Sequence, residues 1–161
     1  MDFGYQDPSA IVDTFYDKTN KVIYVTNEFY KTGQTLEELK KALYNMHLTK
    51  VKVQADSAEP RMIDAFRKDG LYVVPCIKGA NSVDARIAFL QDHKIIVDKK
   101  CVKVIMELSN FSYEKDRKTG KFVDDKYTHE FSHSIDALGY AYSDIYTRSK
   151  LRTFNKAALG L

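Results

Sequence analysis

Apolar and polar residues alternate loosely with a period of two at the start of this chain. Residues 10–16 (AIVDTFY) and 22–30 (VIYVTNEFY) are rich in β-formers, and the DKTN between them is typical of a turn. Together they predict a β-hairpin. Residues 1–5 (MDFGY) predict a short strand fragment that ends at Gly4, before a turn at QDP. We therefore expect three antiparallel strands in a meander.

After residue 34 the apolar positions follow a helical period, interrupted by short extended runs. Helices are predicted over 36–46, from Pro60, over 82–92, around 102–108 and over 131–144. Strands are predicted over 51–55, 71–77 and 95–98. Thr35 and Glu38 form a capping box, and Pro60 suits the first helical position because its missing N–H costs nothing there. A meander followed by βαβ units predicts an α/β fold with one mixed sheet and helices on both faces.

Two further segments stand apart from this alternation. Residues 111–125 are polar, with a DRKTG turn between β-formers, and predict a β-hairpin that projects from the body. Residues 148–161 are weakly patterned and are expected to form a mobile tail. No repeat or low-complexity segment divides the chain, so residues 1–147 are predicted to form one domain with a real hydrophobic core.

Composition and simple motifs exclude several classes of protein. Apolar residues make up 44% and charged residues 29% of the chain, as in ordinary globular domains. There is neither a long apolar run nor a signal-like start, so no membrane span and no secretion are expected. Cys76 and Cys101 lie far apart without a CxxC pair, which indicates buried free thiols rather than a zinc site. The net charge of +3 permits nucleic-acid binding without indicating it. No P-loop motif is present, so the chain is not an ATPase of that kind.

Three aspartates lie where apolar core sequence meets a turn or small residues. Asp2 precedes Phe3 and Gly4, Asp56 ends a short apolar strand, and Asp136 lies beside the apolar stripe of the last major helix. The helical neighbours of Asp136 are small and leave room beside its carboxylate: Ser132, Gly139 and Ser143. Mg²⁺ and Mn²⁺ prefer carboxylate and water oxygens, and two such ions can promote phosphodiester hydrolysis. The pattern therefore makes a three-carboxylate metal site one hypothesis.

Each of these acids also has a simpler interpretation. Asp56 could be a helix N-cap, Asp2 a disordered terminal acid, and Asp136 a charge at the rim of an amphipathic helix. His133 lies one helical turn before Asp136, so it could ligate a metal, transfer a proton, or only face solvent. His129, one turn further back, is a weaker candidate of the same kind.

Basic residues form two small groups that could contact phosphates. Lys78 lies at a strand-to-helix junction beside Gly79. A second group lies on the predicted hairpin: Lys115, Arg117, Lys118 and Lys121. Such side chains suit contacts that position DNA without reading its sequence. A solvated charged turn explains them equally well.

Several motifs together resemble a known family. DFGYQDPSA, ADSAEP, IKGANSV, IIVD and HSIDALGYA occur in the order and approximate spacing of large terminase subunits of tailed bacteriophages. The resemblance is to their C-terminal nuclease domain and covers nearly the whole chain. It implies an RNase H-like fold and a Mg²⁺- or Mn²⁺-dependent endonuclease, with two ions, that cuts concatemeric double-stranded viral DNA during packaging in the infected host's cytoplasm. It also implies partners: a packaging ATPase domain that these residues do not include, the portal and the small terminase subunit.

The resemblance extends to individual residues. It implies that Asp2, Asp56 and Asp136 are the metal-binding aspartates, that His133 assists them, and that residues 111–125 form a hairpin near the active-site groove. Two departures stand out. Only Met1 precedes Asp2, so the strand that carries the first aspartate is shortened, and Gly139 stands where many relatives have arginine, which removes one phosphate contact or salt bridge.

Two rival functions remain compatible with the same residues. One is another RNase H-like nuclease, such as a resolvase or transposase core, which would prefer branched or terminal-repeat DNA. The other is a catalytically silent module that binds DNA or docks onto other packaging proteins.

Overall fold

The computed structural model describes residues 1–116 and 118–151. Three strands form one sheet in the order β1-β2-β5: β1 (Ser9–Asp17), β2 (Val22–Lys31) and β5 (Lys94–Val97). The first two strands pair antiparallel, as the predicted hairpin requires, and β5 joins β2 in parallel. A second pair consists of β3 (Val53–Ala55) and β4 (Val73–Pro75), which are parallel. The predicted strands are therefore present, although β3 and β4 are shorter than predicted and β1 and β2 are slightly longer.

Met1 and Asp2 connect these two sheets. Asp2 pairs antiparallel with Ala10 of β1 through two backbone hydrogen bonds of 2.8 and 3.0 Å. On the other side, the Met1 nitrogen donates to the Gln54 carbonyl at 2.7 Å and the Asp56 N–H donates to the Met1 carbonyl at 3.0 Å. The result is one mixed sheet in the order β5, β2, β1, residues 1–2, β3, β4. Although the first strand is short, its backbone is held on both edges.

The strand fragment predicted over residues 1–5 ends earlier than expected. The chain turns away after Phe3 because the Ser9 side chain ties the following loop together. Its hydroxyl donates to the Gly4 carbonyl at 2.6 Å and accepts from the Gly4 N–H at 3.1 Å. This turn closes the loop that carries Asp7.

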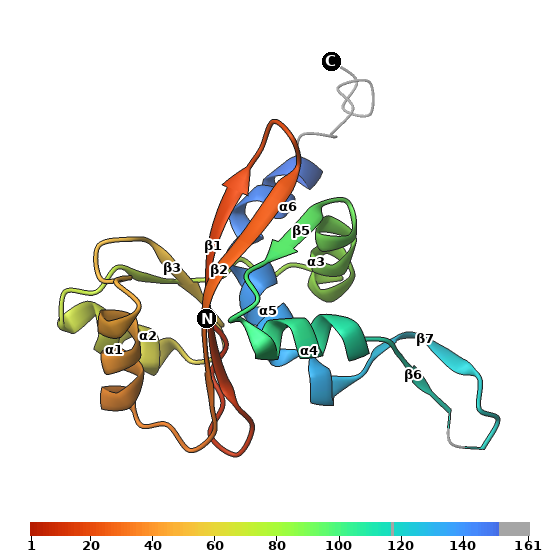
Figure 1. Cartoon of the computed structure of the whole chain (residues 1–161), viewed down its shortest axis with the longest axis horizontal. Helices are drawn as coiled ribbons and strands as arrows, with labels where there is room; N and C mark the ends of the chain where they lie inside the picture. Colours follow the sequence, from red (N-terminus) through yellow and green to blue (C-terminus); the bar gives the residue numbers. More distant parts are fainter. Residues whose placement is uncertain (117, 152–161) are drawn as a thin grey trace, which may run out of the picture.

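Helices cover both faces of the sheet, as predicted (Figure 1). α1 (Leu36–Asn45) and α2 (Pro60–Lys68) pack on one face, in a core that includes Ile11 and Ala55. The other face carries the remaining helices: α3 (Ser82–Gln91), α4 (Val102–Asn110), the 3₁₀ turn η1 (His129–Phe131), α5 (His133–Tyr140) and α6 (Ser143–Leu151). The predicted capping box closes α1, and Pro60 opens α2. Cys76 and Cys101 are buried free thiols, as expected.

The single helix predicted over 131–144 is wrong in detail, because the chain there forms η1, α5 and α6. The break after α5 is stabilised by side chains from elsewhere in the fold. Gln54 donates to the Ala141 carbonyl at 2.7 Å and accepts from the Ser143 hydroxyl at 2.6 Å. The Ile77 N–H also donates to Ser143, at 2.9 Å. The helix break could not be predicted from local periodicity, because these bonds join residues that are far apart in the chain.

The predicted hairpin is present as β6 (Tyr113–Lys115) and β7 (Phe122–Tyr127), and it projects from the body of the molecule (Figure 1). The Tyr127 ring at its base stacks on Phe111 at 5.4 Å between centroids. Helix α6 continues to Leu151, within the predicted tail, and residues 152–161 lie outside the described part. Among the described residues, no helix combines the length and apolar character that crossing a membrane requires.

Candidate metal centre

All four residues predicted to be catalytic or metal-binding line one cleft of about 470 Å³. Asp2 reaches it from the first strand, Asp56 from the end of β3, and Asp136 and His133 from α5. The cleft is also lined by two residues that sequence reasoning ranked low or missed, His129 and Asp7. Residues far apart in the chain thus present carboxylates and imidazoles to one space.

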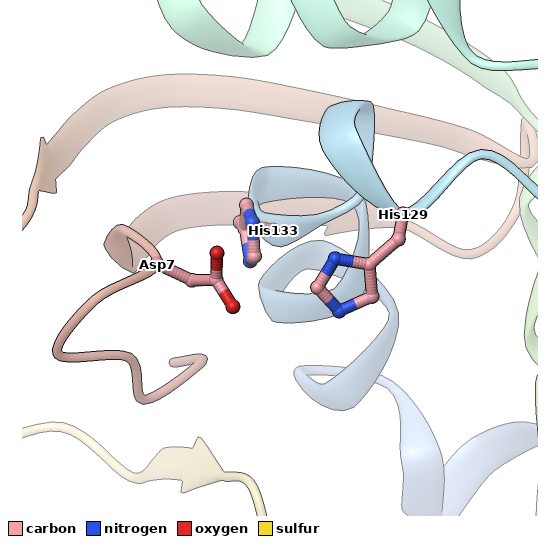
Figure 2. A group of neighbouring side chains, drawn as sticks. All are labelled: Asp7, His129 and His133. Atoms are coloured by element: carbon pink, nitrogen blue, oxygen red, sulfur yellow. The ribbon is translucent and has the colours of Figure 1, made fainter.

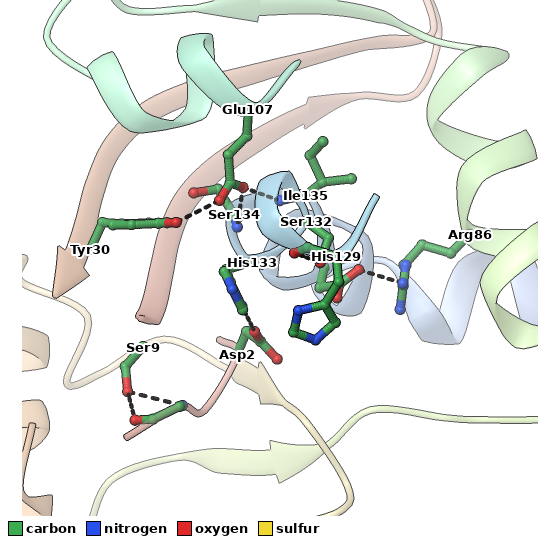
Figure 3. Close-up of polar contacts among 12 residues, drawn as sticks. Asp2, Ser9, Tyr30, Arg86, Glu107, His129, Ser132, His133, Ser134 and Ile135 are labelled. Atoms are coloured by element: carbon green, nitrogen blue, oxygen red, sulfur yellow. Dashed lines mark hydrogen bonds and ion pairs between the residues drawn. The ribbon is translucent and has the colours of Figure 1, made fainter. Parts of the chain in front are cut away.

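The start of α5 is held in place by a buried glutamate of α4 (Figure 3). Glu107 is fully buried and accepts hydrogen bonds from the backbone N–H groups of Ser134 at 2.6 Å and Ile135 at 3.3 Å. The Tyr30 hydroxyl donates to its other oxygen at 2.8 Å. A carboxylate at a helix N-terminus satisfies free N–H groups and complements the helix dipole. Glu107 therefore orients the helix that carries His133 and Asp136 by bonding its backbone.

Each of the three aspartates lies against a basic side chain. His133 Nδ1 lies 3.3 Å from an Asp2 carboxylate oxygen. Lys78 forms an ion pair with Asp56, which also accepts from the Ala58 N–H at 2.9 Å. The predicted N-cap role of Asp56 is not observed, since α2 has no side-chain capping bond. The charges of these three carboxylates are therefore partly offset by neighbouring side chains.

The partner of Asp136 is Arg86, which sequence reasoning missed. The Arg86 side chain extends from α3 and packs against α5 at Gly139. A Cβ added at Gly139 would lie 2.1 Å from the Arg86 Cδ. The guanidinium also lies over the Tyr140 ring, 5.1 Å from its centroid. The sequence predicted that Gly139, by standing in place of an arginine, removes a salt bridge. In the structure Arg86 of α3 supplies a salt bridge at this point, to Asp136.

Burial and charge shift two of the pKa values. Burial raises the pKa of the Asp136 carboxyl to about 6, against the lowering effect of Arg86. The hydrogen bond to Asp2 raises the pKa of His133, against the effect of burial. A carboxylate in such surroundings is stabilised by a nearby positive charge, which a divalent ion supplies as well as Arg86 does. Three carboxylates in one cleft are a donor set that fits hydrated Mg²⁺ or Mn²⁺.

A different set of residues forms the tightest ligand group. Within residues 1–116 and 118–151, ligand atoms that all lie within 4.8 Å of one another occur in Asp7, His129 and His133 (Figure 2). The three aspartates do not form a group this compact. No local pattern distinguished Asp7 in advance, because it belongs to an ordinary turn.

The predicted DNA-contacting residues do not converge on the cleft. Lys78 lies beside it, paired with Asp56 and 5.3 Å from the centroid of the Tyr140 ring. Lys115, Lys118 and Lys121 lie on the projecting hairpin and do not line the cleft. Arg117 lies outside the described residues.

A family model described as the terminase RNase H-like domain matches residues 2–144. The chain belongs to this family. The family resemblance of the sequence motifs and the predicted RNase H-like fold are thereby confirmed. The three aspartates, His133 and the cleft they line all lie within the matched residues.

Similar proteins are large terminase subunits. The chain is 30% identical over 161 residues to the PBSX phage terminase large subunit of Bacillus subtilis (strain 168), covering 97% of this chain and 36% of that protein. It is also 30% identical to the large subunit of Bacillus phage SPP1, covering 88% and 34%. The chain therefore spans about a third of the length of these relatives.

A solved structure shows the same architecture. The nuclease domain of the bacteriophage SPP1 large terminase, solved with bound Mn, superposes with a TM-score of 0.80 at 29% identity, covering 89% of this chain and 82% of that one. This terminase domain thus matches most of an isolated nuclease domain.

Proposed function

We propose that this chain is a divalent-metal-dependent endonuclease domain that cuts double-stranded DNA with little sequence specificity. The observation that carries the proposal is the convergence of Asp2, Asp56 and Asp136 in one cleft of a terminase RNase H-like domain. Mn in the SPP1 nuclease domain supports a divalent metal here. Two Mg²⁺ or Mn²⁺ ions held by these carboxylates would activate water and stabilise the leaving oxygen of a phosphodiester.

The chain's own residues have distinct roles in this proposal. Asp2 and Asp56 project from adjacent segments of the sheet, and Asp136 faces them from α5, so the metal ligands are held by rigid elements. His133, whose Nδ1 lies 3.3 Å from Asp2, would act as a further ligand or as the group that moves a proton at its ring nitrogen. Lys78, which is exposed beside Asp56, would contact a DNA phosphate once a metal ion balances the charge of that carboxylate.

The wider setting is also part of the proposal. Lys115, Lys118 and Lys121 on the hairpin, together with Arg117, would contact the DNA backbone. By analogy with its large-subunit relatives, the domain would act beside a packaging ATPase domain, the portal and the small subunit, cutting concatemeric viral DNA inside the infected bacterium.

Plasmid cleavage tests the assignment. Wild type should nick and linearise supercoiled plasmid in Mn²⁺ or Mg²⁺ and be inactive in a chelator. Asp56→Asn should lose at least about 100-fold in rate, because a metal contributes several kcal/mol to this chemistry. Asp64→Asn, an exposed acid on α2, is the matched control and should cleave like wild type.

The alternatives predict different results. Equal cleavage by wild type and Asp56→Asn would refute the site assignment. A strong preference for branched DNA over plain duplex would indicate a resolvase-type enzyme. DNA binding without metal-dependent cleavage would indicate a silent docking module.

A further inference from the structure

We propose that a groove beside the cleft binds a nucleobase of the DNA strand that is being cut, with the Tyr5 ring as its stacking surface. The groove has a volume of about 500 Å³. It is lined by residues 3–5 after the first strand, by residues 34–36 at the start of α1, and by Glu59 and Met62 at the start of α2. The inference rests on the proposed function, because it assigns a further contact to the substrate of that nuclease.

The groove is continuous with the cleft that contains the three aspartates. Phe3, Gly4 and Tyr5 line both spaces. Asp2, one of the proposed metal ligands, directly precedes Phe3, and consecutive residues advance by only about 3.3–3.6 Å. Each phosphodiester of a DNA strand joins two nucleosides, so a base lies on either side of the phosphate that is cut. A strand whose phosphate reaches the aspartates would therefore bring one of these bases to the groove.

The walls of the groove suit a flat, uncharged ring. Phe3, Leu36 and Met62 contribute partly buried apolar side chains, and Leu39 is buried. The Tyr5 side chain, where the groove meets the cleft, is 69% exposed. Every base has a π-face, so stacking on an aromatic ring accepts any of them. An exposed tyrosine beside apolar walls therefore offers a base both a stacking partner and a surface that excludes water.

The polar residues of the groove favour a base over a phosphate. Among the described residues, those that line the groove include no lysine or arginine. The exposed Glu59 carboxylate repels a phosphate and can accept a hydrogen bond from a base amino group. Gln34 Nε2 donates to the Thr32 carbonyl at 3.0 Å, so the side-chain carbonyl oxygen of Gln34 is left as an acceptor for a base N–H. The sugar–phosphate backbone would thus stay in the cleft while the base enters the groove.

The loop that carries Tyr5 is fixed to the rest of the fold. The Gly33 N–H donates to the Tyr5 carbonyl at 2.8 Å, and the backbone N–H and carbonyl of Gly4 are both hydrogen-bonded. The Phe3 ring stacks on Phe66 of α2, with 6.2 Å between centroids and 19° between planes. The two sides of the groove are therefore held in place before DNA binds, which reduces the entropy lost on binding.

A base can enter the groove only when it is not paired within a duplex. Taking a base out of the stack costs least where it is mismatched or already single-stranded. Single-stranded DNA is therefore the probe that measures the groove without the cost of opening a base pair.

Two single strands of equal length test the groove in the 161-residue chain. One strand consists of thymidine nucleotides, and the other has the same sugars and phosphates but no bases. With Ca²⁺ as the cation, fluorescence anisotropy should show that wild type binds the thymidine strand at least about 5-fold more tightly, the lower end of what stacking of one base contributes. Tyr5→Ala should remove this preference, and Tyr5→Phe should retain it because the ring remains.

A matched variant and a second measurement locate the base. Tyr44→Ala changes a tyrosine that is 56% exposed near the other end of α1 and does not line the groove, so it should bind both strands like wild type. In amide NMR spectra at saturation, the N–H signals of Gln34, Leu36 and Leu39 should shift with the thymidine strand and stay in place with the base-free strand.

The inference is overturned if wild type binds both strands equally, if Tyr5→Ala keeps the preference, or if the three amide signals do not move. None of these measurements requires cleavage. A protein that prefers the thymidine strand but does not cut plasmid would contradict only the proposed nuclease activity. A protein that cuts plasmid without this preference would contradict only the base-binding groove.

Discussion

Replacing Gly139 with alanine should destabilise the domain, although alanine is the better helix former. A Cβ at this position would lie 2.1 and 2.2 Å from the Arg86 Cδ and Cγ atoms. Non-bonded carbon atoms pack at about 3.5–4.0 Å, so the arginine side chain must move by more than about 1 Å. This movement takes the guanidinium away from Asp136 and from the Tyr140 ring.

The expected size follows from three contributions. Glycine to alanine in a helix gains up to about 1 kcal/mol. Overpacking costs about 1–3 kcal/mol. Removing the partner of a buried charge costs about 3–5 kcal/mol when the pair is fully buried, and less here because the Asp136 side chain keeps 20% of its exposure. We expect a net loss of about 2–4 kcal/mol, or about 5–15 °C in Tm for a domain of this size.

A double-mutant cycle measures whether Arg86 is the cause. Unfolding by urea without divalent ions would be compared in wild type, Gly139→Ala, Arg86→Ala and the double variant. Without the arginine side chain the obstacle is gone, so Gly139→Ala should stabilise the Arg86→Ala protein by up to about 1 kcal/mol. The sign of the glycine substitution should therefore reverse. An equal effect of Gly139→Ala in both backgrounds would refute the reasoning.

Three further substitutions test how helix ends are held. Glu107→Gln should cost about 2–3 kcal/mol in urea unfolding, because charge-assisted bonds to a buried carboxylate are lost, and a loss below about 0.5 kcal/mol would contradict this role. Glu28→Ala should cost about 1–2 kcal/mol and speed hydrogen exchange at Lys103 and Val104, whose N–H groups donate to Glu28 at the start of α4; unchanged exchange would disprove the cap. Thr35→Ala should cost about 1 kcal/mol by thermal unfolding, and an equally large loss in Thr35→Ser would exclude the capping hydroxyl as the cause.

Features set by short-range sequence pattern were predicted well. The capping box of Thr35 and Glu38 and the proline that opens α2 both appear where expected. The hairpin of β1 and β2 and the projecting β6–β7 hairpin were also predicted, because alternation and turn residues act between near neighbours. The helix break after Tyr140 was missed, because the residue that bonds Ser143 at the break is Gln54, 89 residues away in the chain.

The candidate site was predicted in part. Asp2, Asp56, Asp136 and His133 were identified from their positions at element ends and from family motifs, and they do share a cleft. Their roles as metal ligands stay predictions until metal binding and cleavage are measured.

The remaining components of the site depend on contacts that no local pattern contains. Arg86 meets Asp136 across 50 residues, and Glu107 caps α5 across 27. Asp7 meets the two histidines only because the first strand is brought beside α5, where Asp2 contacts His133 across 131 residues.

By itself, the sequence determined most of the helices and strands and the acidic residues available for chemistry, because periodicity, capping and turn preference act over a few residues. Only the tertiary structure decided which of those residues meet. It placed Met1 and Asp2 between β1 and β3, gave Asp136 its arginine from another helix, and gathered Asp7 with His129 and His133. The physical reason is that buried charges and ligand groups are paired by packing across the whole sheet, and packing depends on every element at once.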